Sequence, residues 1–394
     1  MTQEPALPQE LFDYIIDFLF DDLESLCACA LVSSHFLPSS RIHVFSHLRL
    51  AIEPERPISE LHNILVRFPH LASRVQSIHI WDHIMRRHSW IEEYPTSLAP
   101  GVAQFSRMLG SLERLAITIE AGFVHWANVS KALRQSIYLT LAVKTLTCLE
   151  VTGIYGLPFK ILAYCRALRS VTLKWVTFDE RDNLDFAAQL AACADSPPTQ
   201  LTHLSIDLDT RVLELLSRWI LLPESPLTIA GLTSFACTAD GLSDNITIQR
   251  LLGECAGSLQ HLRLKNISGA LNLSELERLR TLRVETLSPL EPRLLWLASF
   301  ITFPPHPVGL VISVVSESAS PQVLQLTEID EALAQIPSIA SVALILLPQG
   351  INTSREREQD LVDVSATFAS RMPLAASKGA FQVLRSLRFK AADV

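Results

Sequence analysis

A spaced apolar triplet, L-x-x-L-x-L with other apolar residues in place of some leucines, recurs along this chain of 394 residues. The last two apolar positions alternate, which is typical of a short strand with one buried side, and the first leucine is expected to turn the chain into that strand. The clear triplets are Phe45-Leu48-Leu50, Val75-Ile78-Ile80, Leu112-Leu115-Ile117, Leu146-Leu149-Val151, Leu168-Val171-Leu173, Leu201-Leu204-Ile206, Leu232-Phe235-Cys237, Leu259-Leu262-Leu264, Leu279-Leu282-Val284, Ile339-Val342-Leu344 and Leu384-Leu387-Phe389. A less regular triplet lies near Leu310-Ile312-Val314.

The triplets resemble irregular leucine-rich repeats. Their spacing is uneven, from 20 residues between Leu262 and Leu282 to 37 residues between Ile78 and Leu115, whereas the typical repeat has about 20–29 residues. One strand with one return segment cannot bury its apolar side alone, but stacked copies can. The pattern therefore predicts an α/β fold, a curved solenoid with a parallel sheet on its concave face. Helical return segments are expected at Ser59–Phe68, Leu184–Ala194, Thr247–Leu252 and Ile329–Ile336.

Residues 7–50 follow a different pattern, which predicts helices. Pro8 is tolerated in the first turn of a helix, where its missing N–H would be unpaired anyway. Two apolar stripes at helical spacing indicate two amphipathic helices, and Asp21 or Asp22 is suited to cap the second. The stripes are Leu11, Ile15, Ile16 and Leu19, then Leu23, Leu26, Cys27, Ala30 and Leu31. A third short helix is expected over Ser34–Val44, and three helices of this size need support from the following chain or from a partner.

The order of a Leu-Pro pair, two amphipathic helices and an alternating strand resembles an F-box. The F-box is the helical module that attaches a protein to a cullin-type ubiquitin ligase through the Skp adaptor, and the chain is similar to the large F-box families of mushroom-forming fungi. The family often has a tryptophan after the second helix, where this chain has Phe36 and so keeps an aromatic ring without the indole N–H. The resemblance implies that the adaptor contacts Leu7, Pro8, Leu11, Ile15, Ile16, Leu19, Leu23, Leu26, Leu31, Val32 and Phe36.

The predicted organisation is an F-box over residues 1–52, a short linker over 53–57, and a solenoid over 58–394. The linker, Glu53-Pro54-Glu55-Arg56-Pro57, combines two prolines with three charges and suits a stiff connection. Insertions are expected near residues 83–101 and 348–379. Such additions usually project from the edge of a repeat array.

Composition narrows the compartment and the class of partner. The net charge of −8 gives no basic footprint for nucleic acid. Seven scattered cysteines, none in C-x-x-C spacing, predict neither a disulfide framework nor a structural zinc site. No signal peptide is expected, and the longest uncharged run, Leu294–Ser316, contains three prolines and does not suit a membrane span. We therefore expect a cytoplasmic or nuclear protein that binds neither nucleic acid nor membrane.

Motifs of catalysis and cofactor binding are absent from the sequence. It contains no G-x-x-x-x-G-K-[ST], G-x-G-x-x-G or G-x-S-x-G signature. His79 and His83 have the spacing of a helical metal pair, but His79 lies in an expected strand, where the two side chains would be about 13 Å apart. Asp207 and Asp209 lie two residues apart on one face of another expected strand. They are expected to be solvated acids without a catalytic role. The sequence therefore predicts a non-catalytic chain without a cofactor or a metal.

Basic residues recur on the side of the later strands that faces away from the apolar triplet. In the expected register these are Lys174, His203, His261, Arg263, Lys265 and Arg283. Arginine binds carboxylate and phosphate groups through paired hydrogen bonds, so this group is a candidate contact for an acidic or phosphorylated target segment. The alternative is an ordinary solvated strand face.

These patterns together predict the substrate-recognition subunit of a Skp–cullin–F-box ubiquitin ligase, whose N-terminal helices bind the Skp adaptor and whose repeats bind an unknown target. Two alternatives remain open. The first is a protein-binding scaffold that never joins a ligase. The second is a hydrolase built on a repeat-like α/β chain. The hydrolase would need a nucleophile and a base close together, which the sequence does not reveal.

Overall fold

The structure is a computed structural model of the chain. It describes residues 7–51, 58–82, 109–119, 122–129, 131–179, 197–238, 242–266, 270–286, 301–316, 331, 334, 336, 338–348 and 381–385. The chain divides into two compact units, Met1–Thr199 and Gln200–Val394. The predicted linker 53–57, the insertion near 83–101 and the helix at Leu184–Ala194 lie outside the described residues, as do most of the insertion near 348–379 and of the helix at Ile329–Ile336.

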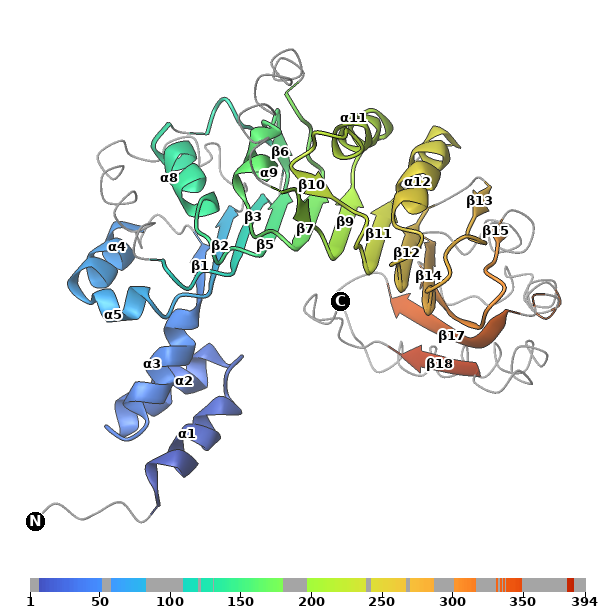
Figure 1. Ribbon diagram of the computed structural model, residues 1–394. Helices are drawn as coiled ribbons and strands as arrows, with labels where there is room; N and C mark the ends of the chain where they lie inside the picture. Colours follow the sequence, from blue (N-terminus) through green and yellow to red (C-terminus); the bar gives the residue numbers. More distant parts are fainter. Residues whose placement is uncertain are drawn as a thin grey trace, which may run out of the picture. The chain divides into compact units, whose positions relative to one another are not determined.

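The first unit begins with three helices, α1 (Gln9–Asp17), α2 (Leu23–Val32) and α3 (Leu37–Ser46). Pro8 lies at the N-cap of α1, and Asp22 caps α2 by accepting a hydrogen bond from the backbone N–H of Ser25 at 3.1 Å. The third helix begins three residues later than predicted, and Pro38 occupies its first turn, where proline is tolerated. The three helices form a small bundle next to the first strand (Figure 1).

A parallel sheet follows in the first unit. Its strands are β1 (His47–Ala51), β2 (Ser77–Asp82), β3 (Arg114–Ile119), β5 (Cys148–Thr152) and β7 (Ser170–Lys174), paired in that order. The register places the triplet residues opposite one another, so that Leu48, Ile78, Leu115, Leu149 and Val171 form one buried row across the sheet. The residues between them form the opposite, more exposed side.

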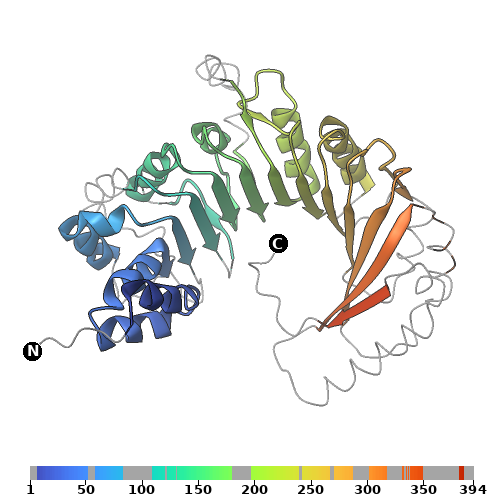
Figure 2. The same ribbon diagram turned by 60° about the horizontal axis from the view of Figure 1, so that its bottom comes forward.

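The return segments of the first unit cover one side of this sheet (Figures 1 and 2). They contain α4 (Ile58–Arg67), α5 (Pro69–Ala72), α8 (Lys131–Leu141) and α9 (Lys160–Tyr164). A small parallel pair, β4 (Val124–His125) with β6 (Ile154–Tyr155), lies in the same return layer. The predicted helix at Ser59–Phe68 is confirmed within one residue at each end.

The second unit repeats the arrangement. Its strands β9 (His203–Asp207), β11 (Ser234–Thr238), β12 (His261–Lys265), β14 (Thr281–Thr286), β16 (Val308–Ser316), β17 (Ile339–Pro348) and β18 (Phe381–Arg385) pair in that order, and every pair is parallel. Leu204, Phe235, Leu262, Leu282 and Leu310 form a buried row.

The return segments of the second unit lie on one side of its strands (Figure 1). They hold α11 (Thr210–Ile220), the short strand β10 (Leu227–Thr228) and α12 (Leu242–Glu254), which is longer than the predicted Thr247–Leu252. A parallel pair, β13 (Leu271–Asn272) with β15 (Ile301–Thr302), completes this layer. The short strand β8 (Thr199–Gln200) lies where the two units are divided.

The predicted α/β class, with N-terminal helices followed by a parallel sheet, is confirmed. Each of the first nine triplets supplies a strand, and the leading residue of each of the last eight of these, such as Leu112 and Leu259, is fully or almost fully buried. The last triplet is described only in part: Leu384 lies inside β18, which covers Phe381–Arg385 and pairs Phe381 with Val342 and Val383 with Leu344. Leu387 and Phe389 lie outside the described residues.

Candidate binding surfaces

Large apolar side chains are concentrated on the outside of the N-terminal helices. Among the described residues of the chain, exposed large hydrophobic side chains are densest here, and Leu31 is the most exposed of them at 89%. A concentration of exposed apolar side chains marks an interaction site more often than an isolated exposed leucine does. We call the following residues the N-terminal apolar surface: Leu7, Leu11, Tyr14, Ile15, Phe18, Phe20, Leu23, Leu31 and Val32.

Helix α1 presents its apolar stripe outward. Leu11, Tyr14, Ile15 and Phe18 have the i, i+3, i+4, i+7 spacing of one helix face, and all four are exposed, Phe18 to 68%. The rings of Tyr14 and Phe18 make an edge contact with their centroids 4.8 Å apart. A surface helix normally turns such a stripe toward the core, so this orientation leaves an apolar face available to another molecule.

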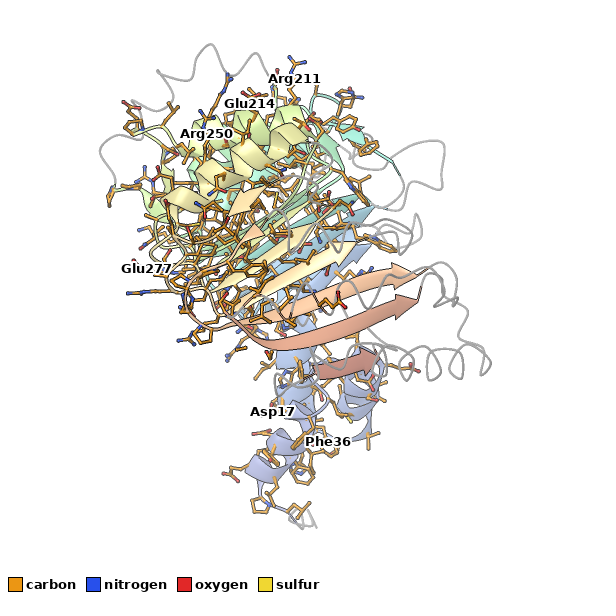
Figure 3. All side chains as sticks on the ribbon, turned by 90° about the vertical axis from the view of Figure 1, so that its right-hand side faces the viewer. Asp17, Phe36, Arg211, Glu214, Arg250 and Glu277 are labelled. Carbon is orange, nitrogen blue, oxygen red and sulfur yellow. The ribbon has the colours of Figure 1, made fainter. Side chains whose placement is uncertain are left out.

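Polar contacts on the opposite side of α1 hold it in this orientation. The Gln9 side-chain amide donates to the carbonyl of His35 at 2.8 Å, Asp13 accepts from the Ser39 hydroxyl, and the Asp17 carboxylate lies 2.7 Å from the His43 ring nitrogen. The hydrogen bonds from Ser39 and then Gln9 lower the pKa of Asp13. Asp17 at the end of α1 and Phe36 at the N-cap of α3 are labelled in Figure 3.

Apolar contacts beneath α1 complete the bundle. Phe12 packs edge-on against Phe36, with centroids 5.0 Å apart, and stacks on His35 at 5.5 Å. Ile16 of α1 and Leu26 of α2 are completely or almost completely buried. The bundle core therefore uses only a few apolar residues, and the larger set remains outside.

The predicted adaptor contacts divide into three groups. Leu7, Pro8, Leu11, Ile15, Leu23, Leu31 and Val32 are exposed, whereas Leu19 and Phe36 are half-buried. The prediction that Ile16 and Leu26 lie on the surface was wrong, because their side chains form the bundle core. Tyr14, Phe18 and Phe20 were missed, although the spacing of Tyr14 and Phe18 relative to Leu11 and Ile15 places them on one helix face.

A second candidate surface is the exposed side of the sheet in the second unit. On β12, His261, Arg263 and Lys265 alternate with the buried Leu262 and Leu264, and β14 pairs Arg283 with Arg263. The alternation confirms the register from which these basic residues were predicted to share one side. His203 of β9 lies on the same side, since it pairs with Ser234, which in turn pairs with His261.

The structure corrects the predicted state of the two arginines. Arg263 Nη2 lies 2.9 and 3.0 Å from the two carboxylate oxygens of Glu285, and Arg283 Nε lies 2.8 Å from one of them. Glu285 is 7% exposed. Burial lowers the pKa of Arg283, with a further contribution from the Arg263 charge, and the Glu285 carboxylate opposes both. The arginines thus form an internal ion-pair group instead of two solvated charges.

The other predicted basic residues are less constrained. Lys174 is exposed at the end of β7 in the first unit, whereas β12 and β14 belong to the second. His203 is exposed, with its ring nitrogen 2.9 Å from the Thr202 hydroxyl. His261 lies 2.7 Å from the Thr281 hydroxyl, and Lys265 is half-buried.

Two cysteines and a histidine of the repeats have internal polar contacts. Cys165 and Cys255 are buried directly after α9 and α12, and their thiols lie 3.8 and 3.3 Å from the carbonyls of Ile161 and Leu251. His79 lies 2.9 Å from the Thr118 hydroxyl, while His83 lies outside the described residues. Within the described ranges, no group of three His, Cys, Asp or Glu residues is arranged to hold a metal ion, and no helix has the length and apolarity that crossing a membrane requires.

The sequence was also compared with known proteins. No protein-family model matches the chain, and no curated protein matches it significantly.

Proposed function

We propose that this chain is the substrate-recognition subunit of a Skp–cullin–F-box ubiquitin ligase. In this proposal α1–α3 are an F-box that binds the Skp adaptor, and the stacked parallel strands form a leucine-rich-repeat-like solenoid that binds a target protein on its exposed sheet side. The chain has no active site of its own. It accelerates ubiquitin transfer by holding the target near the conjugating enzyme.

One observation carries the proposal: α1 turns its apolar stripe outward while its polar residues contact α3. Leaving Leu11, Tyr14, Ile15 and Phe18 in water costs free energy that burial against a partner would recover, at about 25 cal/mol per Å² of apolar surface. The exposed Leu7 and Pro8 extend this surface at the entry to α1. An apolar helix face of this kind suits docking between the helices of another protein.

The stacked strands support the target-binding half of the proposal. Each strand contributes two buried apolar residues and, between them, side chains that line the opposite side of the sheet, as with Leu262, Arg263 and Leu264 on β12. Repetition of this unit extends the exposed side without enlarging the core. Such a surface suits recognition of an extended protein segment.

The proposal is tested by co-expressing the full-length chain with a Skp adaptor and measuring co-purification. The double variant Leu7→Asp, Ile15→Asp places two charges on the N-terminal apolar surface and is expected to abolish complex formation. Ile246→Asp is the matched control, because Ile246 is an exposed isoleucine on α12 in the other unit. It is expected to leave the complex intact.

Absence of a complex with the unmodified chain would contradict the ligase assignment and would favour a target-binding scaffold without a ligase. Retention of the complex by the double variant would show that the adaptor binds elsewhere. Circular dichroism of each variant establishes that the helices are still folded.

A further inference from the structure

The charge of the chain is unevenly distributed along the sequence. The whole chain carries a net charge of −8, but residues 122–174 contain seven Lys or Arg and a single acidic residue, Glu150. Glu150 lies on β5 between the buried Leu149 and Val151, which face the return segments, so its side chain points to the opposite side of the sheet. We predicted no nucleic-acid ligand from the net charge of the whole chain, which averages over this difference.

Two tyrosines and a lysine of this stretch meet where α8 and α9 pack together (Figure 1). The rings of Tyr138 on α8 and Tyr164 on α9 have centroids 5.3 Å apart, and Lys160 Nζ lies 5.6 Å from the centroid of the Tyr138 ring. The buried Trp126 makes an edge contact with Tyr138, with centroids 6.1 Å apart, and supports its ring. Tyr164 is 49% exposed. The tyrosine pair therefore forms an aromatic surface with a cation at its edge.

Two further cations lie on the same face of α8 as Tyr138. Lys131 and Arg134 precede Tyr138 by seven and four residues, the spacing that places side chains on one helix face. Lys131 is exposed and Arg134 is half-buried. On α9, Lys160 likewise precedes Tyr164 by four residues. One face of each helix thus combines cations with an aromatic ring.

A second pair of rings lies in the same return layer, beside β4 and on β6. Phe123 stacks on Tyr155 with centroids 4.3 Å apart and an interplanar angle of 12°, and His125 contacts Tyr155 at a steep angle with centroids 5.7 Å apart. Phe123 is 50% exposed, and His125 is exposed as well. His125 directly precedes Trp126, which contacts Tyr138, so the two exposed ring pairs are joined through neighbouring residues.

We propose that this return layer of the first unit binds single-stranded nucleic acid. Bases stack on Tyr164 and Phe123. The phosphates contact Lys131, Arg134 and Lys160. Every base has a π face, so exposed rings beside a row of cations suit an unpaired strand of any sequence. An acidic protein segment would pair with the cations but leave the rings unused, and a duplex hides the faces of its bases. The inference depends neither on attachment to a ligase nor on target binding by the sheet.

The test measures fluorescence anisotropy of labelled oligo(U) and oligo(dT), each of about 12 nucleotides, with the full-length chain and without the Skp adaptor. The wild-type chain is expected to bind at least one of them, and the preference between the two identifies RNA or DNA as the ligand. Tyr164→Leu keeps an apolar side chain but removes the ring, and it is expected to weaken binding about tenfold, the effect of losing one base stack. Tyr164→Phe is the matched control, because it keeps the ring and is expected to bind like the wild type.

Lys160→Gln separates the phosphate contacts from the stacking. It is expected to weaken binding of both oligonucleotides alike and to reduce the slope of log affinity against log salt concentration by about 0.7, the value for one phosphate of a single strand. Tyr164→Leu is expected to leave this slope unchanged. Arg250→Gln is the matched control for charge, because Arg250 is an exposed arginine on the return helix α12 of the second unit. It is expected to change neither the affinity nor the slope.

Four results would overturn the proposal: binding of neither oligonucleotide, tighter binding of a duplex of the same length, competition by polyglutamate of equal charge as effective as that by the unlabelled oligonucleotide, or wild-type affinity of Tyr164→Leu. If Tyr164→Leu does not fold, Phe123→Leu, which alters the other ring pair, decides the question. None of these results bears on adaptor capture, so failures of the two proposals remain distinguishable.

Discussion

Two repeats place a cysteine at nearly the same position, directly after the return helix. Cys165 and Cys255 precede the leading leucines of their triplets by three and four residues. Both thiols are buried there and point at helical carbonyls. A free cysteine behaves as a small apolar side chain with a weak S–H donor, which suits a buried turn beside helical carbonyls.

Burial raises the pKa of the Cys165 and Cys255 thiols from 9.0 to about 12. The unfolded chain loses these protons near pH 9, while the folded chain keeps them. The resulting stabilisation is therefore fully present below pH 9 and is lost as the pH rises toward 12, at about 1.4 kcal/mol per pH unit for each thiol. Between pH 7 and pH 10, urea titrations are expected to show the free energy of unfolding of wild type falling by about 1.4 kcal/mol more than that of Cys165→Ala.

The comparison needs a control for effects of alkaline pH on other groups. Cys27→Ala removes an exposed thiol from α2 and is expected to follow the wild type at every pH. If the free energies of unfolding of wild type and Cys165→Ala differ by the same amount at every pH from 7 to 10, the Cys165 thiol does not cause the pH dependence.

Either of two faces of helix α1 could in principle be buried against the rest of the bundle. Its sequence contains two sets of residues with helical spacing, an apolar set and a mixed set that includes Gln9, Asp13 and Asp17. Periodicity alone favours burial of the more apolar set. In the structure the mixed set faces α3 and the residue before its N-cap, because Gln9 donates to the His35 carbonyl, Asp13 accepts from Ser39 and Asp17 contacts the His43 ring.

Asp13→Ala is expected to loosen α1 without touching the N-terminal apolar surface. Loss of its carboxylate leaves the Ser39 hydroxyl, which is mostly buried, without that acceptor. Hydrogen exchange of the amides in Gln9–Asp17 is expected to rise several-fold, and adaptor capture is expected to weaken. Because hydrogen bonding lowers the pKa of Asp13, its contribution is present above the ordinary value of 3.8 and is lost as the pH falls below it.

Glu10→Ala is the matched control for this variant, because Glu10 is an exposed acid in the first turn of the same helix. In Glu10→Ala the hydrogen-exchange rates of the α1 amides are expected to equal those of the wild type, except in the first turn. Unchanged exchange in Asp13→Ala would mean that the apolar contacts of Phe12 and Ile16 alone hold the helix.

At the scale of the whole molecule, each strand depends on its neighbours in the sheet. Leu262 of β12 is buried between Phe235 of β11 and Leu282 of β14. Stability in such an array is approximately a sum of units and of the contacts between adjacent units. Local damage is therefore expected to spread to adjacent strands first.

Leu262→Ala is expected to destabilise the second unit by about 2–5 kcal/mol, the usual cost of truncating a buried leucine. Hydrogen exchange is expected to increase most in β11, β12 and β14 and least in β17, which is separated from β12 by β14 and β16. Leu222→Ala removes a leucine that is partly exposed and is expected to change the stability by less than about 0.5 kcal/mol. A uniform increase across the unit would indicate all-or-none unfolding instead.

The main strands could be predicted from the sequence, because alternation such as Leu262-Arg263-Leu264 places alternate side chains on opposite sides in any sheet. It also predicted that His261, Arg263 and Lys265 share one side. Short return strands such as β4 and β13 were missed, since two residues carry no measurable periodicity. β18 begins at Phe381, three residues before the final triplet, and its register is the one that pairs Phe381 with Val342 and Val383 with Leu344.

Which apolar residues of α1 and α2 are exposed could not be predicted from the sequence and depends on how the helices pack. Ile15 and Ile16 are adjacent and equally apolar, yet one is exposed and the other is fully buried. Likewise, the spacing that brings Arg263 beside Arg283 did not reveal that both are bound to Glu285. Exposure and ion pairing depend on which neighbour occupies the adjoining space, and that neighbour comes from another part of the chain.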